Sequence, residues 1–126
     1  MTTFTRCPAN ANPIAVTVEH FVDDTPDLSW LTQDYEDIGD PVEAARYREQ
    51  DRERMETYGH QWIMIGIRAH AGMYINGVYQ RLTSAGLWGI ESDSDADYLR
   101  SIEEEEKAEL IAIIRAIDPD AVIEED

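Results

Sequence analysis

The chain has 126 residues, enough for one domain with its own core, and its 27 Asp and Glu against 10 Lys and Arg give a formal net charge of −17. Apolar residues make up 43% of the sequence, so the acids belong to a folded protein rather than to a disordered chain. The single cysteine, Cys7, excludes an internal disulfide and no apolar run is long enough to span a membrane, so we expect a soluble, cytoplasmic, single domain over residues 1–126.

The first third of the chain predicts one strand between irregular segments. Prolines and asparagines in residues 1–13 are typical of an irregular lead-in. Apolar and polar residues alternate over residues 14–22, which predicts a strand. The acidic connection of residues 23–40 follows, and Trp30 and Leu31 are expected to anchor it on the core, because long connections with no structure of their own are uncommon.

A well-marked helix comes next. Asp40 is a suitable N-cap, Pro41 fits the first helical position, and Glu43 stands where a capping box places its acid. We expect the helix to run to about Thr57 and to end before Gly59. Its apolar stripe is thin, so the helix is expected to be mostly exposed.

The middle of the chain predicts a β-hairpin. Residues 62–75 alternate, with the isoleucines on one face, and Asn76-Gly77 is the strongest short signal for a two-residue turn. Such a turn pairs His70 with Thr83. The isoleucine face is expected to pack on the core. The opposite face collects Trp62, Met64, Arg68, His70, Tyr74, Tyr79 and Arg81.

The last third predicts a long helix. Residues 84–90, punctuated by glycines, indicate a turn anchored by Trp88, after which Ser92 or Ser94 would cap the helix. Pro119 ends it. The expected buried stripe consists of Leu99, Ile102, Leu110, Ile113, Ile114 and Ile117.

The pattern as a whole indicates an α+β fold. Val122 and Ile123 can add a short strand within the acidic tail of residues 118–126. The N-terminal strand and the Asn-Gly hairpin form a small antiparallel sheet. The long C-terminal helix covers one face of this sheet, and the charged helix remains mostly exposed.

Nothing in the sequence predicts a catalytic site, a cofactor or a metal. Asp93, Asp95 and Asp97 begin like a calcium-binding loop, but Tyr98 replaces the glycine of the sharp turn and Arg100 replaces the inner apolar residue. The histidines lack the spacing of zinc ligands, and there is no nucleophile elbow or phosphate-binding loop. Weak cation binding at these aspartates stays open as an alternative.

The second face of the hairpin is a candidate ligand site. It carries Arg68, His70, Tyr74, Tyr79 and Arg81. Arginine and tyrosine together can bind an anion or a nucleobase. The alternative, which the abundance of acids favours, is that the arginines pair internally with acids of residues 23–43 or of the first helix.

The acids are concentrated in blocks. Residues 19–43 contain nine acids and no base, whereas residues 57–90 contain no acid at all. Such a field steers partners with basic surfaces. The candidate partner-binding acids are Asp34, Glu36, Asp37, Asp93, Asp95, Asp97, Glu103, Glu104, Glu105 and Glu106. A merely solvated face, or a salt-adapted source that prefers arginine to lysine, would produce the same bias.

The segment GLWGIESDSDADYL, residues 86–99, resembles a group of small acidic proteins of phages and mobile genetic elements, with a weaker similarity at residues 62–69. The resemblance implies a setting in which such proteins act against host defence, as anti-restriction and anti-CRISPR proteins do. With the charge, it suggests a non-enzymatic DNA mimic that occupies a basic nucleic-acid groove and binds neither nucleic acid nor membrane itself. A small-ligand or cation-binding protein and an accessory structural protein of a mobile element are the alternatives.

Overall fold

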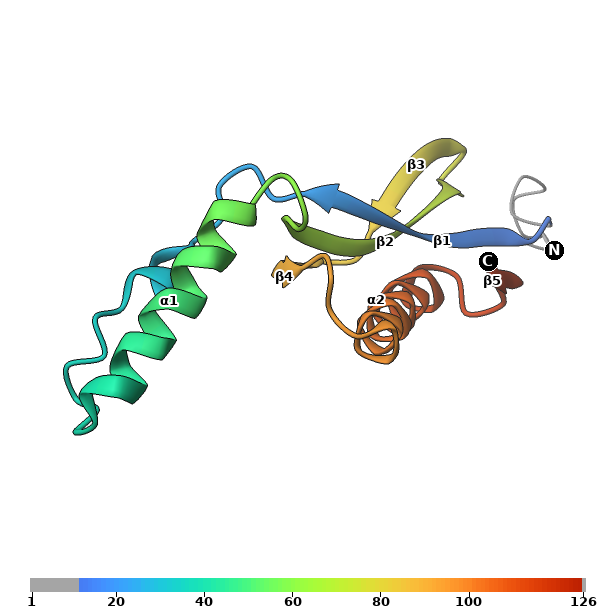
Figure 1. The fold of residues 1–126 in the computed structure, drawn as a ribbon. Helices are drawn as coiled ribbons and strands as arrows, with labels where there is room; N and C mark the ends of the chain where they lie inside the picture. Colours follow the sequence, from blue (N-terminus) through green and yellow to red (C-terminus); the bar gives the residue numbers. More distant parts are fainter. Residues whose placement is uncertain (1–11, 126) are drawn as a thin grey trace, which may run out of the picture.

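A computed structural model describes residues 12–125 and confirms the α+β fold (Figure 1). The elements are β1 (Ile14–Val22), the 3-10 helix η2 (Ser29–Thr32), α1 (Pro41–Thr57), β2 (Met64–Ile75), β3 (Val78–Thr83), β4 (Leu87–Glu91), α2 (Ala96–Ile117) and β5 (Ile123–Glu125). Cys7 and most of the expected lead-in lie outside the described residues. No helix in the described range is long and apolar enough to cross a bilayer.

Strand β2 is the centre of the sheet. It pairs with β1 along one side, and on its other side with β4 near its start and with β3 near its end. The hairpin register is as predicted, with His70 opposite Thr83, and Asn76 and Gly77 have φ angles of 52° and 81°. Strand β5 extends the sheet by pairing in parallel with the start of β1.

The turn predicted over residues 84–90 is wrong in its second half, because β4 pairs there with the start of β2. Gly86 and Gly89 have φ angles of 87° and 73°, and the register shifts between Ile65 and Ile67. These glycines therefore accommodate an irregularity in strand pairing rather than end the strand.

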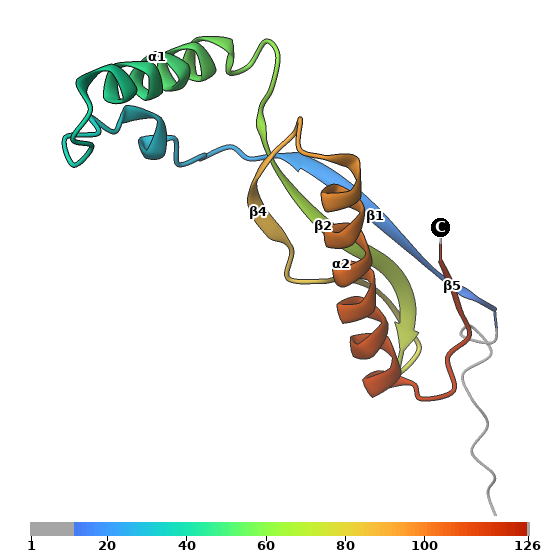
Figure 2. The same ribbon diagram turned by 60° about the horizontal axis from the view of Figure 1, so that its bottom comes forward.

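Helix α2 covers one face of the sheet (Figures 1 and 2). Ile102, Leu110 and Ile114 are its buried residues, and they pack on apolar residues of β1 and β2. The predicted stripe is too wide: Ile113 and Ile117 are 36% and 42% exposed. Ile113 lies on the flank of the helix, about 100° from Ile114, and Ile117 is its last residue.

Neither predicted serine caps α2, whose N-cap residue is Asp95. The hydroxyl of Ser92 accepts a hydrogen bond from the amide of Ile63 at 2.9 Å, and that of Ser94 donates to the carbonyl of Glu91 at 2.6 Å. Both serines thus stabilise the connection before the helix instead of its first turn.

Residues 23–57 form an arm that projects from the sheet, with η2 packed along α1 (Figures 1 and 2). The Asp40 side chain accepts from the amide of Val42 as expected of an N-cap. Trp30, one of the two predicted anchors of the arm, is 37% exposed, and its ring centroid lies 6.3 Å from that of Trp62. Leu31 anchors the arm as predicted. It is buried with Trp62 and Met64, which the sequence had placed among the polar residues of the second sheet face.

Glu106 joins α2 to the β3–β4 connection. Its carboxylate accepts hydrogen bonds from the hydroxyl of Ser84 at 2.8 Å and from the amide of Gly86 at 2.7 Å. Ser84 is buried, and its hydroxyl in turn accepts from the amide of Ala69 in β2. This acid is therefore part of the fold.

Replacing Glu106 by alanine is expected to lower the free energy of unfolding by about 2 kcal/mol, since the buried Ser84 hydroxyl and the Gly86 amide lose their acceptor. Glu105→Ala, which removes the same charge from the preceding position of α2, is expected to change the free energy of unfolding by no more than about 0.5 kcal/mol. Urea denaturation of both variants measures the difference, and equal losses would contradict the structural role of Glu106.

Candidate interaction surfaces

The face of the sheet opposite α2 is not covered by any helix of residues 12–125 (Figures 1 and 2). We call it the open face. Its side chains and glycines are Ala15, Thr17, Glu19 and Phe21 from β1, Gly66, Arg68, His70, Gly72 and Tyr74 from β2, Tyr79 and Arg81 from β3, Trp88 from β4 and Glu124 from β5. The five residues of the predicted ligand face thus share one surface.

Glu19 is the centre of the open face. Its carboxylate accepts from Arg68 Nε and from Arg81 Nη2, each at 2.9 Å. His70 Nε2 lies 3.9 Å from Glu19 Oε2 and 2.6 Å from the Thr17 hydroxyl. The arginines are thus paired internally, but with β1 and not with residues 23–43 or the first helix, because the antiparallel register puts Glu19 directly opposite Arg68.

The pKa of Glu19 follows from this pairing. Partial burial acts to raise it, but the hydrogen bond from Arg68 and the positive charges of His70 and Arg81 outweigh burial. The pKa of the carboxyl group is consequently lowered from its ordinary value of 4.5.

This lowered pKa predicts an acid-sensitive contribution to stability. Because the pKa of Glu19 is lower in the folded protein than in the unfolded chain, its ionised carboxylate stabilises the fold fully above pH 4.5. This contribution is lost as the pH falls through the lowered pKa of the folded protein. Glu19→Gln is expected to be about 1 kcal/mol less stable than the unmodified protein at pH 7 and equally stable in strong acid. Urea denaturation from pH 7 to pH 2 measures this, and a pH-independent difference would contradict it.

Two glycines of β2 lie beneath aromatic rings. A side-chain carbon at Gly66 would clash with the ring of Trp88, and one at Gly72 would clash with the hydroxyl end of Tyr79. Both rings remain accessible, since Trp88 is 47% and Tyr79 is 62% exposed. The open face therefore has a charged centre between two aromatic ends, Tyr74 with Tyr79 and Phe21 with Trp88.

Trp88, Phe21 and Glu19 were not identified from the sequence as part of this face. The signal for the last two is the strand alternation, which places odd-numbered residues of β1 opposite the core. Trp88 can be placed on this face only once β4 is known, because the local sequence there predicts a turn.

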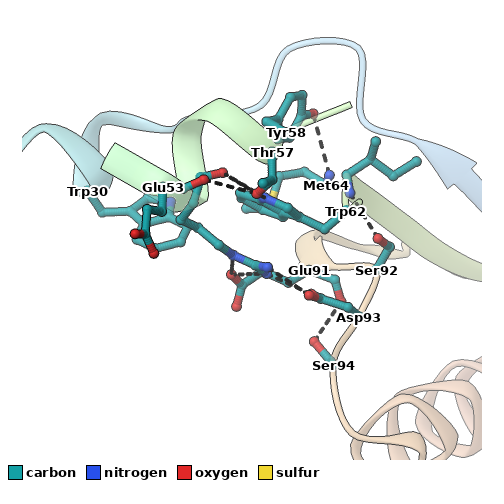
Figure 3. A network of polar contacts seen from close by, with 12 residues as sticks. Trp30, Glu53, Thr57, Tyr58, Trp62, Met64, Glu91, Ser92, Asp93 and Ser94 are labelled. Atoms are coloured by element: carbon teal, nitrogen blue, oxygen red, sulfur yellow. Dashed lines mark hydrogen bonds and ion pairs between the residues drawn. The ribbon is translucent and has the colours of Figure 1, made fainter. Parts of the chain in front are cut away.

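A second polar network attaches α1 to the body of the protein (Figure 3). The Arg54 guanidinium donates to Asp93 at 2.6 and 2.7 Å and to Glu91 at 2.8 Å, and it lies 3.7 Å from the centre of the Trp62 ring. The indole N–H of Trp62 donates to the Arg54 carbonyl at 2.8 Å. The Arg54 hydrogen bond lowers the pKa of Asp93, which identifies this acid as an internal partner.

Removing this guanidinium should loosen the arm. Arg54→Ala is expected to lower the free energy of unfolding by about 2 kcal/mol and to speed amide hydrogen exchange over residues 41–57. The matched control is Arg52→Ala, which removes an exposed arginine paired only with Glu49 and Glu56 of the same helix and should cost at most about 0.5 kcal/mol. Similar exchange rates in the two variants would contradict the attachment.

The predicted row of glutamates on α2 is divided by the helix geometry. Glu103 Oε1 lies 3.0 Å from His20 Nε2, and Glu104 Oε1 lies 3.7 Å from Lys107 Nζ. Glu106 is hydrogen-bonded to Ser84. Glu105 is exposed and has no cationic partner among the described residues. The row therefore contains both structural and displayed acids.

The other predicted acids lie in two separate places. Asp95 and Asp97 are exposed at the start of α2, where Asp97 pairs with Arg100 at 3.3 Å. Asp34, Glu36 and Asp37 are exposed in residues 33–40 at the tip of the arm, remote from α2 in both views (Figures 1 and 2). The structure does not bring these two groups together.

The basic side chains are largely occupied by the chain itself. Eight of the nine described Lys and Arg side chains contact an acid or a carbonyl: Arg46, Arg48, Arg52, Arg54, Arg68, Arg81, Arg100 and Lys107. Most of the acid surplus is therefore left uncompensated on the surface.

In residues 12–125 no three His, Cys, Asp or Glu side chains are gathered closely enough to hold a metal ion. Comparison of the chain with models of protein families, with curated protein sequences and with solved structures finds no significant match. The function is therefore inferred from the surfaces described above.

Proposed function

We propose that this chain is a cytoplasmic, non-enzymatic binding protein. The acidic side of α2 that points away from the sheet, which we call its outer face, would occupy a basic nucleic-acid groove of a host defence or DNA-processing protein. The observation that carries the proposal is that eight of the nine described Lys and Arg side chains already contact an acid or a carbonyl of the chain, so few cations remain to offset the surplus of displayed acids. A protein with this field attracts basic surfaces and repels nucleic acid.

The exposed acids that would make the contact are Asp95, Asp97, Glu104 and Glu105. The side chains of Asp97 and Glu104 are 84% and 61% exposed even though each has a cation nearby. Seven residues separate them, so they lie about 10 Å apart along the helix axis. This is the rise of about three base pairs of duplex DNA, so the two carboxylates match the scale of a phosphate backbone.

Other acids are less suited to this role. Asp93 and Glu106 are held by Arg54 and by Ser84, and Glu103 lies against His20. Their charge still adds to the field around α2, but their carboxylates are partly engaged within the chain. The arm acids Asp34, Glu36 and Asp37 form a separate patch that would contact a different part of a partner.

The test is a charge reversal with a matched control. Glu104→Lys/Glu105→Lys changes the net charge by four units on the outer face of α2, and Glu124→Lys/Glu125→Lys makes the same change in β5. Each immobilised protein is incubated with a host lysate, and retained proteins are eluted with salt and with duplex DNA. We expect a nucleic-acid-binding protein that DNA displaces, with retention at least tenfold lower for the α2 variant and little changed for the β5 variant.

Two outcomes would contradict the proposal. An equal loss of retained protein in both variants would mean that total charge alone causes retention. Retention that DNA does not displace would place the contact outside a nucleic-acid groove. Circular dichroism and thermal unfolding of both variants show whether each is folded.

A further inference from the structure

The open face contains a hollow that takes no part in the contact proposed for the acidic face of α2. It has a volume of about 410 Å³ and lies between the start of β1 and the Tyr74–Tyr79 pair. Thr17, His70 and Gly72 also line it. Small-molecule sites in proteins are typically clefts of about 300–1,000 Å³, so the hollow is large enough for a ligand of modest size.

The walls of the hollow combine an aromatic surface with polar atoms. The rings of Tyr74 and Tyr79 meet edge to face with centroids 5.2 Å apart, and Tyr79 is 62% exposed. His70 Nε2 and the Thr17 hydroxyl form the polar side. A flat ring placed on Tyr79 would have hydrogen-bonding groups beside it.

Two arginines lie on the open face beside the hollow, and Glu124 of β5 lies on its other side, next to Ala15. Arg81 stands opposite Gly72 in the register and crosses the face to Glu19, and Arg68 contacts the same carboxylate. One carboxylate thus faces two guanidinium groups. Arg81 uses Nη2 for Glu19 and its side chain is 57% exposed, so further N–H donors remain for an anion.

We propose that this hollow binds a small ligand made of a flat aromatic group with one anionic substituent, the ring against Tyr79 and the anion reaching Arg81, which stands beside the hollow opposite Gly72. Arg81 has N–H donors that Glu19 does not use, which suits a single anionic group. A polyanion such as single-stranded nucleic acid would meet the repulsion of the net charge of −17. This site is separate from the acidic face of α2, so either proposal can fail without the other.

The test uses two probes with the proposed chemistry. Adenosine monophosphate carries a phosphate and indole-3-acetate a carboxylate, and neutral adenosine is the control without an anion. Titration calorimetry and amide chemical shifts of β2 and β3 measure binding. Saturable binding of one or both anionic probes, with at least tenfold weaker binding of adenosine, is the expected result, and the tighter probe identifies the anion.

Variants locate the binding. Tyr79→Ala and Arg81→Gln are each expected to weaken the tighter probe at least tenfold. Tyr98→Ala and Arg100→Gln change a tyrosine and an arginine on α2 that are also exposed, and they should leave the affinity unchanged. Arg81→Gln keeps the hairpin side chains in place, so it remains informative if Tyr79→Ala is unstable.

The proposal is overturned if neither anionic probe binds saturably, or if the α2 variants weaken binding as much as the open-face variants. It is also overturned if a ten-residue oligothymidylate binds more tightly than adenosine monophosphate, because the face would then be a surface for nucleic acid.

Discussion

The folding of this chain is constrained by its charge, because ten basic side chains must serve twenty-seven acids. An ionised carboxylate near the core is stable only when a cation or several hydrogen bonds compensate its lost hydration. Three acids are held by such partners at three joints of the structure; Glu19 and Glu106 are partly buried, whereas Asp93 is exposed. Glu19 connects β1 to β2 and β3, Glu106 connects α2 to the β3–β4 connection, and Asp93 connects α1 to the segment before α2.

The same constraint separates the two sides of the molecule. The arginines that compensate Glu19 place two cations on the open face, whereas the outer face of α2 has acids with few cations. A partner with a basic groove and a small anionic ligand would therefore use different surfaces. The glycines of β2 contribute to the second surface, since they let the ring of Trp88 and the hydroxyl end of Tyr79 approach the central strand closely.

Local patterns predicted most of the fold. Alternation located β1 and β2, the Asn76-Gly77 pair determined the hairpin register, and Asp40 with Pro41 marked the start of α1. Strand β4 was missed because its glycines indicate a turn when read locally, and its pairing with β2 is a long-range contact. For the same reason Trp62 was assigned to a polar face, although the arm covers it.

The sites were less predictable than the fold. Strand alternation put Arg68, His70 and Arg81 on one face, but their partner Glu19 depends on the register between β1 and β2, which no turn determines. A row of four adjacent glutamates gives no indication of which one is hydrogen-bonded. Only the packing of α2 on the sheet distinguishes Glu106 from Glu105.

Carboxyl footprinting tests the division between structural and displayed acids most directly. The folded protein is treated with a water-soluble carbodiimide and glycine ethyl ester, and the labelling rate of each acid is read by peptide mass spectrometry. We expect Asp95 and Glu105 to react rapidly and Glu19 and Glu106 to react many times more slowly, with the difference abolished in urea. Equal labelling of Glu105 and Glu106 in the folded protein would contradict the account.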